Sequence, residues 1–249
     1  MNFIKNLFSK NKTIYLDAYT NDSLVHKYFP IQESSFYIPE WWKKIPAKVY
    51  EENAPIHSDG FELPTMKKCP GFIELFKKSF SYPLWSDLEL IMNGDEEKTY
   101  SYRFGFDNEF DISTHGAHEY GEFLSKGDFV HIKLMSPWFV EASENIDWAI
   151  MPAMWNYGEN MSRVFVVPGI DNYLFNHSTT WQMFVENKEQ VINLSAGTPL
   201  VHMIPITERK VEVRSHLDSQ KYQDLKRSTS AFSFTNNYYT KKRLLEKHS

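Results

Sequence analysis

Histidine and acidic side chains at short spacing are the first candidates for chemistry in this chain of 249 residues. His57 and Asp59 have the His-x-Asp spacing that begins a 2-His-1-carboxylate iron site, and His115 and His118 lie three residues apart. Imidazole and carboxylate groups bind iron or zinc. The pair at 115 and 118, followed by Glu119, is not the helical His-Glu-x-x-His motif. Because such spacings are common by chance, we expect hydrogen-bonded or surface histidines and no cofactor, with an iron or zinc site as the alternative.

Asp171 is a second candidate, in the turn-like segment 168–171 (Pro-Gly-Ile-Asp). Together with the Gly-Thr-Pro turn at 197–199, this segment resembles trimeric dUTPase and dCTP deaminase-like proteins, in which an Asp in such a turn orients the hydrolytic water. The sequence lacks the glycine- and serine-rich phosphate loops of that family and has only 10 Gly. We therefore expect Asp171 to be a turn residue that caps its own backbone.

Aromatic side chains dominate the composition, with 19 Phe, 14 Tyr and 7 Trp making up 16% of the chain. They fit the pleated, half-buried surface of a sheet. Tryptophan is rarely buried completely, so seven of them exceed what one core is expected to hold. Because exposed Trp side chains anchor protein interfaces, we predict that Trp41, Trp42, Trp85 and Trp138 belong to an interaction surface.

Charge and cysteine content narrow the function classes. The net charge is -5 and the isoelectric point is about 6.0, so the sequence gives no strong signal of nucleic-acid binding. Cys69 is the single cysteine, which excludes an intramolecular disulfide and favours a small buried side chain. Residues 1–12 lack the apolar centre of a secretion signal, and no apolar run approaches the roughly 20 residues of a membrane span. We expect a soluble cytoplasmic protein.

Strands are the elements that the sequence predicts most often. Apolar and polar residues alternate with a period of two, which is typical of half-buried strands. The expected strands are 13–19, 88–92, 99–106, 129–134, 138–140, 148–151, 163–167, 181–185, 191–194 and 200–206. Asn93 and Gly94 predict a hairpin turn between the second and third of these, because both residue types tolerate positive φ. Short strands separated by turn signals predict a β-sandwich or a jelly-roll-like barrel.

A few short helices are predicted at the periphery of these strands. One helical turn is expected at 39–46, between two prolines, and an apolar stripe predicts a longer helix over 70–80. The chain is expected to divide into three parts, an N-terminal arm at 1–12, a single β domain at 13–210 and a polar, helical C-terminal tail at 211–249.

Six short motifs occur in an order that resembles one protein family. They lie at 38–46, 67–72, 83–87, 136–138, 168–171 and 197–200. Over about residues 25–210, this order is similar to an uncharacterised family of marine, T4-like tailed bacteriophages, which is related to a bacterial domain of unknown function. The resemblance implies a bacteriophage source, and it implies no activity and no catalytic residue.

Two functions remain. The first is a non-enzymatic phage protein, a virion component or a host-interaction module, which acts in the host cytoplasm or within the virion. It would assemble through aromatic surfaces as a homo-oligomer or with other phage proteins. The second is a small-molecule enzyme, either with a cupin-like metal site at His57, Asp59, His115 or His118, or with a nucleotide-hydrolase site at Asp171. We favour the first, because no acid–base or metal-binding set rises above chance.

Overall fold

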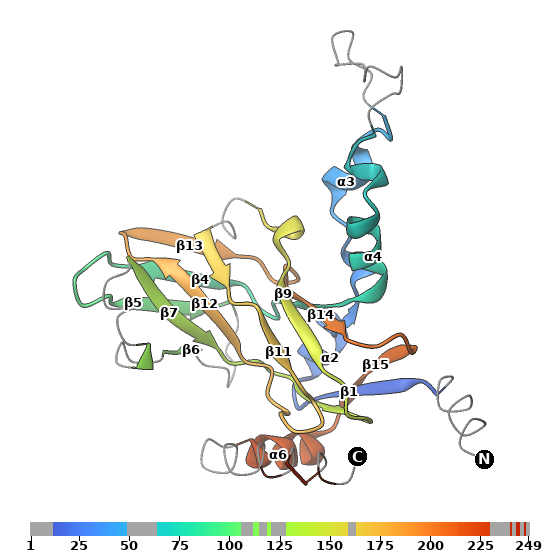
Figure 1. The fold of residues 1–249 in the computed structure, drawn as a ribbon. Helices are drawn as coiled ribbons and strands as arrows, with labels where there is room; N and C mark the ends of the chain where they lie inside the picture. The colour runs from blue at the N-terminus through green and yellow to red at the C-terminus, as the bar shows by residue number, and fades with distance from the viewer. Residues whose placement is uncertain are drawn as a thin grey trace, which may run out of the picture.

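The computed structural model describes residues 12–48, 64–105, 112–114, 119–120, 128–158, 163–229, 240, 243–244 and 247. Most of their regular structure is β-strand, arranged in four sheets. Figure 1 shows the sheets gathered in one body with short helices at its edges. The predicted class, mainly β with a few short helices, is confirmed, although the described strands do not close into a barrel.

The largest sheet has the strand order β11-β9-β14-β3-β2, with every neighbouring pair antiparallel. Its strands are β2 Gln32–Glu33, β3 Phe80–Pro83, β9 Trp148–Pro152, β11 Gly169–Asp171 and β14 Pro199–Pro205. The segment predicted as a turn at 168–171 is therefore an edge strand for most of its length. Backbone pairing with β9 overrides the local turn signal, and Asp171 is the last residue of the strand.

Two further sheets have the orders β10-β12-β7-β6 and β13-β4-β5. Their strands are β6 Ile112–Ser113, β7 Phe129–Leu134, β10 Val164–Val166 and β12 Trp181–Glu186 in one, and β4 Leu88–Met92, β5 Tyr100–Phe104 and β13 Gln190–Leu194 in the other. The β4–β5 connection contains Gly94 at φ +68°, as the predicted turn requires. A Cβ at this position would also lie 2.5 Å from the backbone nitrogen of Glu189.

The fourth sheet, β15-β1-β8, brings together distant parts of the chain. Its strands are β1 Ile14–Thr20, β8 Phe139–Ala142 and β15 Val211–Leu217. β1 pairs in parallel with β15, so the tail that was predicted to be helical from 211 begins as a strand. The reason lies in the alternation of Val211 and Val213, which pack against the core, with charged residues between them.

One hydrophobic core joins all four sheets. The strand β1 buries Ile14, Leu16 and Ala18 on one face, as the predicted alternation requires. Trp85 and Trp138 are also buried completely, with 0% of each residue exposed. These two tryptophans were predicted to lie on an interaction surface. Their burial instead assigns them to the core of this chain.

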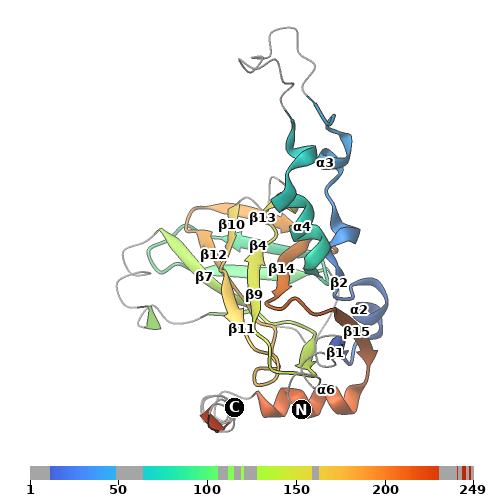
Figure 2. The ribbon, with the colours of Figure 1, turned by 45° about the vertical axis from the view of Figure 1, so that its right-hand side comes forward.

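A projecting arm is built from four short helical segments. They are η1 Ser34–Tyr37, α3 Glu40–Lys44, η2 Met66–Lys68 and α4 Pro70–Lys78. Figures 1 and 2 show α3 and α4 extending beyond the sheets. Both helices form where the sequence predicted them, and α4 buries Phe72 and Phe76. We call residues 34–48 and 64–78 the aromatic arm.

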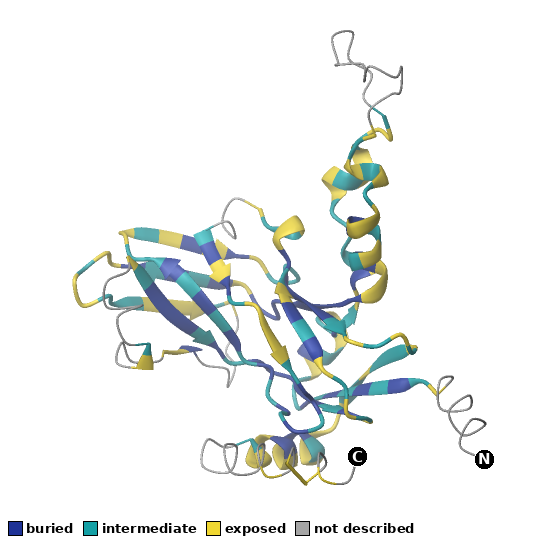
Figure 3. Ribbon diagram, in the orientation of Figure 1, coloured by how far each residue is buried: buried dark blue, intermediate teal, exposed yellow. Residues whose placement is uncertain are grey.

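Other described helical segments lie outside the arm. They are α2 Ser23–Tyr28, η4 Met154–Asn156 and α6 Ser219–Ser228. α6 packs Tyr222 and Leu225 against Phe139 of β8. In Figure 3 the buried positions run through the sheets, while much of α3, α4 and α6 is exposed. Within the described ranges, no helix has the length and apolar character needed to cross a membrane.

Candidate functional site

The predicted metal ligands His57, Asp59, His115 and His118 lie outside the described residues. In the part of the chain that the structure describes, no three His, Cys, Asp or Glu side chains are grouped so that they could hold a metal ion. The metal site therefore stays a prediction. The candidates that can be placed are Asp171, Trp41, Trp42 and several groups that the sequence did not single out.

Asp171 lines a cleft of about 650 Å³. The walls of the cleft come from β7, β8, β12, the end of β11 and the loop that follows it, and α6, and they include Lys133, Asn176, Gln182 and Lys226. Clefts that hold small molecules usually measure roughly 300–1,000 Å³. The volume and the mixture of charged, amide and hydroxyl groups make this the first candidate site.

The carboxyl group of Asp171 is held by two hydrogen bonds. Oδ1 accepts from the backbone N–H of Asn172 at 2.8 Å, and Oδ2 accepts from Nδ2 of Asn176 at 2.7 Å. Burial raises the pKa of Asp171 to about 6, although both hydrogen bonds favour the charged form. The carboxyl group therefore changes its protonation close to neutral pH. A titratable group perturbed in this way inside a cleft is a candidate functional group.

Lys133 and Gln182 lie directly opposite each other on β7 and β12. The Gln182 amide is fixed by His131, whose Nε2 lies 2.5 Å from Gln182 Oε1. When His131 donates this hydrogen bond, the Gln182 Nε2 group keeps its own donors for a ligand. Lys226 enters from α6, and neither lysine forms an ion pair within the described ranges. The cleft thus offers two ammonium groups, one carboxyl group and hydrogen-bond donors.

A buried serine–histidine cluster lies next to α4. The Oγ atoms of Ser34 and Ser81 lie 3.1 Å and 3.3 Å from His202 Nδ1, and the ring of Phe76 packs edge-on against the imidazole. Burial lowers the pKa of His202 to about 4, because the charged imidazolium is disfavoured away from water. A hydroxyl beside a histidine is the pair used in nucleophilic catalysis. Both serines are 0% exposed, so we interpret this cluster as part of the packed interior.

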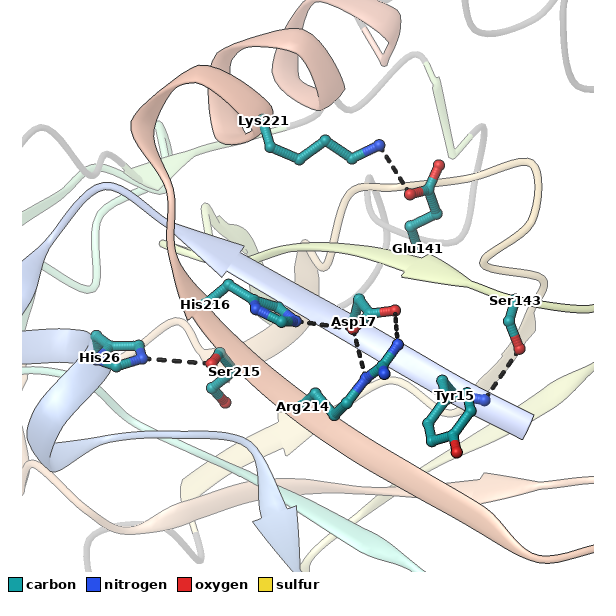
Figure 4. Close-up of polar contacts among 9 residues, drawn as sticks. All are labelled: Tyr15, Asp17, His26, Glu141, Ser143, Arg214, Ser215, His216 and Lys221. Carbon is teal, nitrogen blue, oxygen red and sulfur yellow. Dashed lines mark hydrogen bonds and ion pairs between the residues drawn. The ribbon is translucent and has the colours of Figure 1, made fainter. Parts of the chain in front are cut away.

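Figure 4 shows a polar network on the outer face of the β15-β1-β8 sheet. Asp17 accepts two hydrogen bonds from Arg214, at 2.8 Å and 2.7 Å, and one of its oxygens lies 2.7 Å from His216 Nε2. The rings of Tyr19 and His216 stack with centroids 4.8 Å apart, and the Arg214 guanidinium lies 4.0 Å from the centroid of the Tyr15 ring. The network therefore links the outer side chains of β1 and β15.

The electrostatics of this network favour a structural role. Burial raises the pKa of Asp17, but the hydrogen bonds and charges of Arg214 and His216 outweigh burial and hold this pKa below its ordinary value. An Asp that orients a His also occurs in acid–base catalysis. In the described ranges, however, no Ser, Thr or Cys side chain is hydrogen-bonded to His216. We interpret the network as a tie between two strands whose paired residues are 197 positions apart.

The aromatic arm carries the exposed tryptophan that the sequence predicted. Trp41 is 40% exposed and Trp155, from η4 on the body, is 42% exposed. Their rings lie 6.0 Å apart, and Trp41 Nε1 donates a hydrogen bond to the Trp155 carbonyl oxygen at 3.0 Å. Phe72 contacts both rings and stacks on Trp42 at 5.1 Å. We call Trp41, Trp42, Phe72 and Trp155 the aromatic cluster.

Further apolar side chains are exposed on the arm and on the neighbouring η4. Phe36 and Met154 are about 70% exposed, at 70% and 69%. Met66 of η2 is also exposed, and its carbonyl oxygen accepts a hydrogen bond from Trp42 Nε1 at 3.0 Å. The Lys67 ammonium lies 4.4 Å from the centroid of the Trp42 ring. The arm therefore combines exposed apolar side chains with an ordered set of indoles.

Sequence reasoning missed Lys133, Gln182 and Trp155. Alternation along the predicted strand places Lys133 on the outer face, but only the register of β7 against β12 makes Gln182 its neighbour. Trp155 follows a strand in a segment without a periodic signal, and the sequence does not show that it meets Trp41. The missing information is in each case a long-range contact.

Comparison with known proteins identifies no relative of this chain. The chain matches no protein-family model, no curated protein and no solved structure. The function must therefore be argued from the geometry of the cleft, the network and the aromatic cluster.

Proposed function

We propose that this chain is a non-enzymatic interaction module that docks a protein partner with an apolar surface through the aromatic arm. The observation that carries the proposal is the aromatic cluster, in which Trp41 and Trp155 are 40% and 42% exposed although their rings are in mutual contact. Tryptophan is the residue most enriched among the energetic hot spots of interfaces. Methionine adapts its shape to a partner, and Met66 and Met154 are exposed nearby in the fold.

The cluster is ordered before any partner arrives. The two indole N–H groups of Trp41 and Trp42 are hydrogen-bonded to the carbonyl oxygens of Trp155 and Met66. Phe72, the fourth member of the cluster, is buried and contacts the rings of Trp41 and Trp155. Side chains that are already fixed lose little rotamer freedom on binding, so more of the gain from burying their surface is kept.

Charge favours a protein over a nucleic acid as the partner. The described residues of the arm contain seven Lys and two Glu, a net charge of +5. Residues 49–63, which connect them, contribute four acidic side chains, so the stretch 34–78 has a net charge of only +1. Binding to a phosphate backbone needs a sustained basic surface. The apolar side chains are therefore the dominant feature, and exposed lysines such as Lys44 and Lys68 are expected to lie at the rim.

The resemblance to a bacteriophage family supports a partner among phage or host proteins. A virion component and a host-interaction module would use the same surface. Quantitative mass spectrometry of purified particles from the source virus separates these two possibilities, since a virion component is present there at a fixed copy number.

The test is site-specific photo-crosslinking in infected cells. A photoreactive phenylalanine analogue replaces Phe36 on the arm, and a matched control carries it at Phe165, which is 50% exposed on β10. We expect one protein to crosslink at Phe36 and not at Phe165. Binding of that purified protein should weaken at least about tenfold in Trp155→Ala, which corresponds to about 1.4 kcal/mol.

Three outcomes would contradict the proposal. One is equal crosslinking at both positions. Another is unchanged affinity in Trp155→Ala with a native circular dichroism spectrum. The third is crosslinking to nucleic acid, with an affinity that falls steeply as the salt concentration rises. Light scattering could also show a dimer of the wild-type chain that Trp155→Ala abolishes. The partner would then be a second copy of the chain and not a different protein.

A further inference from the structure

We propose that the cleft beside Asp171 binds a small hydroxylated anion, of the class of sugar acids and sugar phosphates. The site is separate from the aromatic cluster, and it does not depend on the proposed docking function. Its walls come from four strands (β7, β8, β11 and β12), a loop and a helix that are far apart in the sequence, so the folded chain builds it as a unit.

The charges in the cleft select an anion. Lys133 on β7 and Lys226 on α6 both line it, and in the described ranges neither forms an ion pair. Asp171 is the single carboxyl group among the lining residues that the structure describes, and its carboxyl oxygens already accept hydrogen bonds from Asn172 and Asn176. The two ammonium groups therefore remain available for a phosphate or a carboxylate on the ligand.

The hydrogen-bonding groups in the cleft other than the lysines select hydroxyls. Asp171 Oδ1 and Oδ2 each accept one hydrogen bond and keep a second acceptor position, and Gln182 provides an amide. Ser178 and Thr180 hydrogen-bond each other at 2.8 Å. Met135 lines the same cleft and offers apolar surface to the C–H groups of a sugar ring. A small number of polar groups around an apolar surface is the usual composition of a small-molecule site.

The loop between β11 and β12, which carries Ser178 and Thr180, is held in place by hydrogen bonds to neighbouring segments. The Asn172 amide donates to Asn145 Oδ1 and Asp147 Oδ1, both at 2.8 Å. Further along the loop, the Thr179 hydroxyl donates to the Trp138 carbonyl oxygen at 2.8 Å. Preorganisation of this kind lowers the entropic cost of binding a small ligand.

The test is isothermal titration calorimetry of the full chain with four probes, glucose 6-phosphate, glucuronate, glucose and inorganic phosphate. We expect at least one of the two anionic sugars to bind, and glucose and inorganic phosphate to bind at least about tenfold more weakly. Lys133→Met and Lys226→Met should each weaken that binding by about tenfold or more, because each removes a charge-assisted hydrogen bond. Lys188→Met, an exposed lysine on the β12–β13 turn, is the matched control and should change nothing.

The proposal is overturned if neither anionic sugar binds at millimolar concentration. It is also overturned if the double variant of Lys133 and Lys226 keeps wild-type affinity, or if inorganic phosphate binds as tightly as glucose 6-phosphate. A preference for glucuronate over glucose 6-phosphate would assign the ligand to the sugar acids, and the reverse to the sugar phosphates. Trp155→Ala should leave sugar binding intact, so failure of the docking proposal and failure of this one are distinguishable.

Discussion

Replacing Asp171 by Asn should stabilise the protein at alkaline pH. Burial raises the pKa of Asp171 from 3.8 to about 6, so the folded state disfavours the carboxylate that the unfolded chain carries. A difference of about two pH units corresponds to about 3 kcal/mol of destabilisation above the folded pKa. The amide of the Asp171→Asn variant removes this cost, but its Nδ2 group cannot accept one of the two hydrogen bonds, which costs about 1 kcal/mol. The net gain should be about 1–2 kcal/mol.

The sign of the pH dependence follows from the raised pKa. The cost of Asp171 is fully present above about pH 7 and disappears as the pH falls through 6 towards 3.8. We expect urea unfolding to show Asp171→Asn more stable than wild type at about pH 8 and no more stable than wild type at about pH 4, where only the cost of the lost hydrogen bond remains. Comparing the two proteins at each pH cancels the contribution of His202 to the free energy of unfolding, because His202 titrates in the same range in both. Glu208→Gln, at an exposed position, is the control.

A stability difference that stays constant from about pH 4 to pH 8 would refute this reasoning, because it would mean that the carboxyl group is not buried at a cost. A clear gain in stability in Asp171→Asn would have a second meaning. A carboxyl group kept where it destabilises the fold is typical of a functional site, since stability and function are often in conflict there.

Three further perturbations test other parts of the structure. Because burial lowers the pKa of His202 to about 4, wild type should lose stability as the pH falls from 6.5 towards 4, and His202→Gln should flatten that loss in urea titrations. Asp17→Asn should cost about 1 kcal/mol at neutral pH, because its partners are partly exposed, and the cost should vanish in acid as the pH falls through the lowered pKa of Asp17. Gly94→Ala should lower the unfolding free energy by about 1–3 kcal/mol in the same assay, since a Cβ meets backbone at 2.5 Å; an unchanged value would contradict the hairpin geometry.

Local periodicity was sufficient to predict many of the strands. The alternation of Ile14, Leu16 and Ala18 marked β1, and the aromatic stripe over 70–80 marked α4. The same alternation was present in β15, but its charged residues led to the prediction of a polar tail. Pairing with β1 determines the conformation there. Very short strands such as β2 have too few residues for a period to appear.

The candidate sites were less predictable than the strands, because each depends on long-range contacts. Asp171 was identified from its turn-like segment, yet its raised pKa arises from burial that no local sequence pattern shows. Counting tryptophans predicted that some would be exposed. It did not distinguish Trp41, which lies on the surface, from Trp85 and Trp138, which fill the core. The sheet topology makes that distinction, since it determines which side chains are covered by other strands and which face solvent.

The parallel pairing of β1 with β15 has a consequence for the order of events during synthesis. The paired residues Asp17 and Arg214 are separated by 197 positions. Ribosomes add about 5–20 residues per second, so β1 leaves the ribosome roughly 10–40 s before its parallel neighbour is made. During that interval one edge of an apolar strand has no partner, and such edges promote aggregation. Pairing with β8 closes the other edge of β1 and leaves only the β15 edge open, so the speed of translation through residues 139–142 is expected to influence the yield of folded protein.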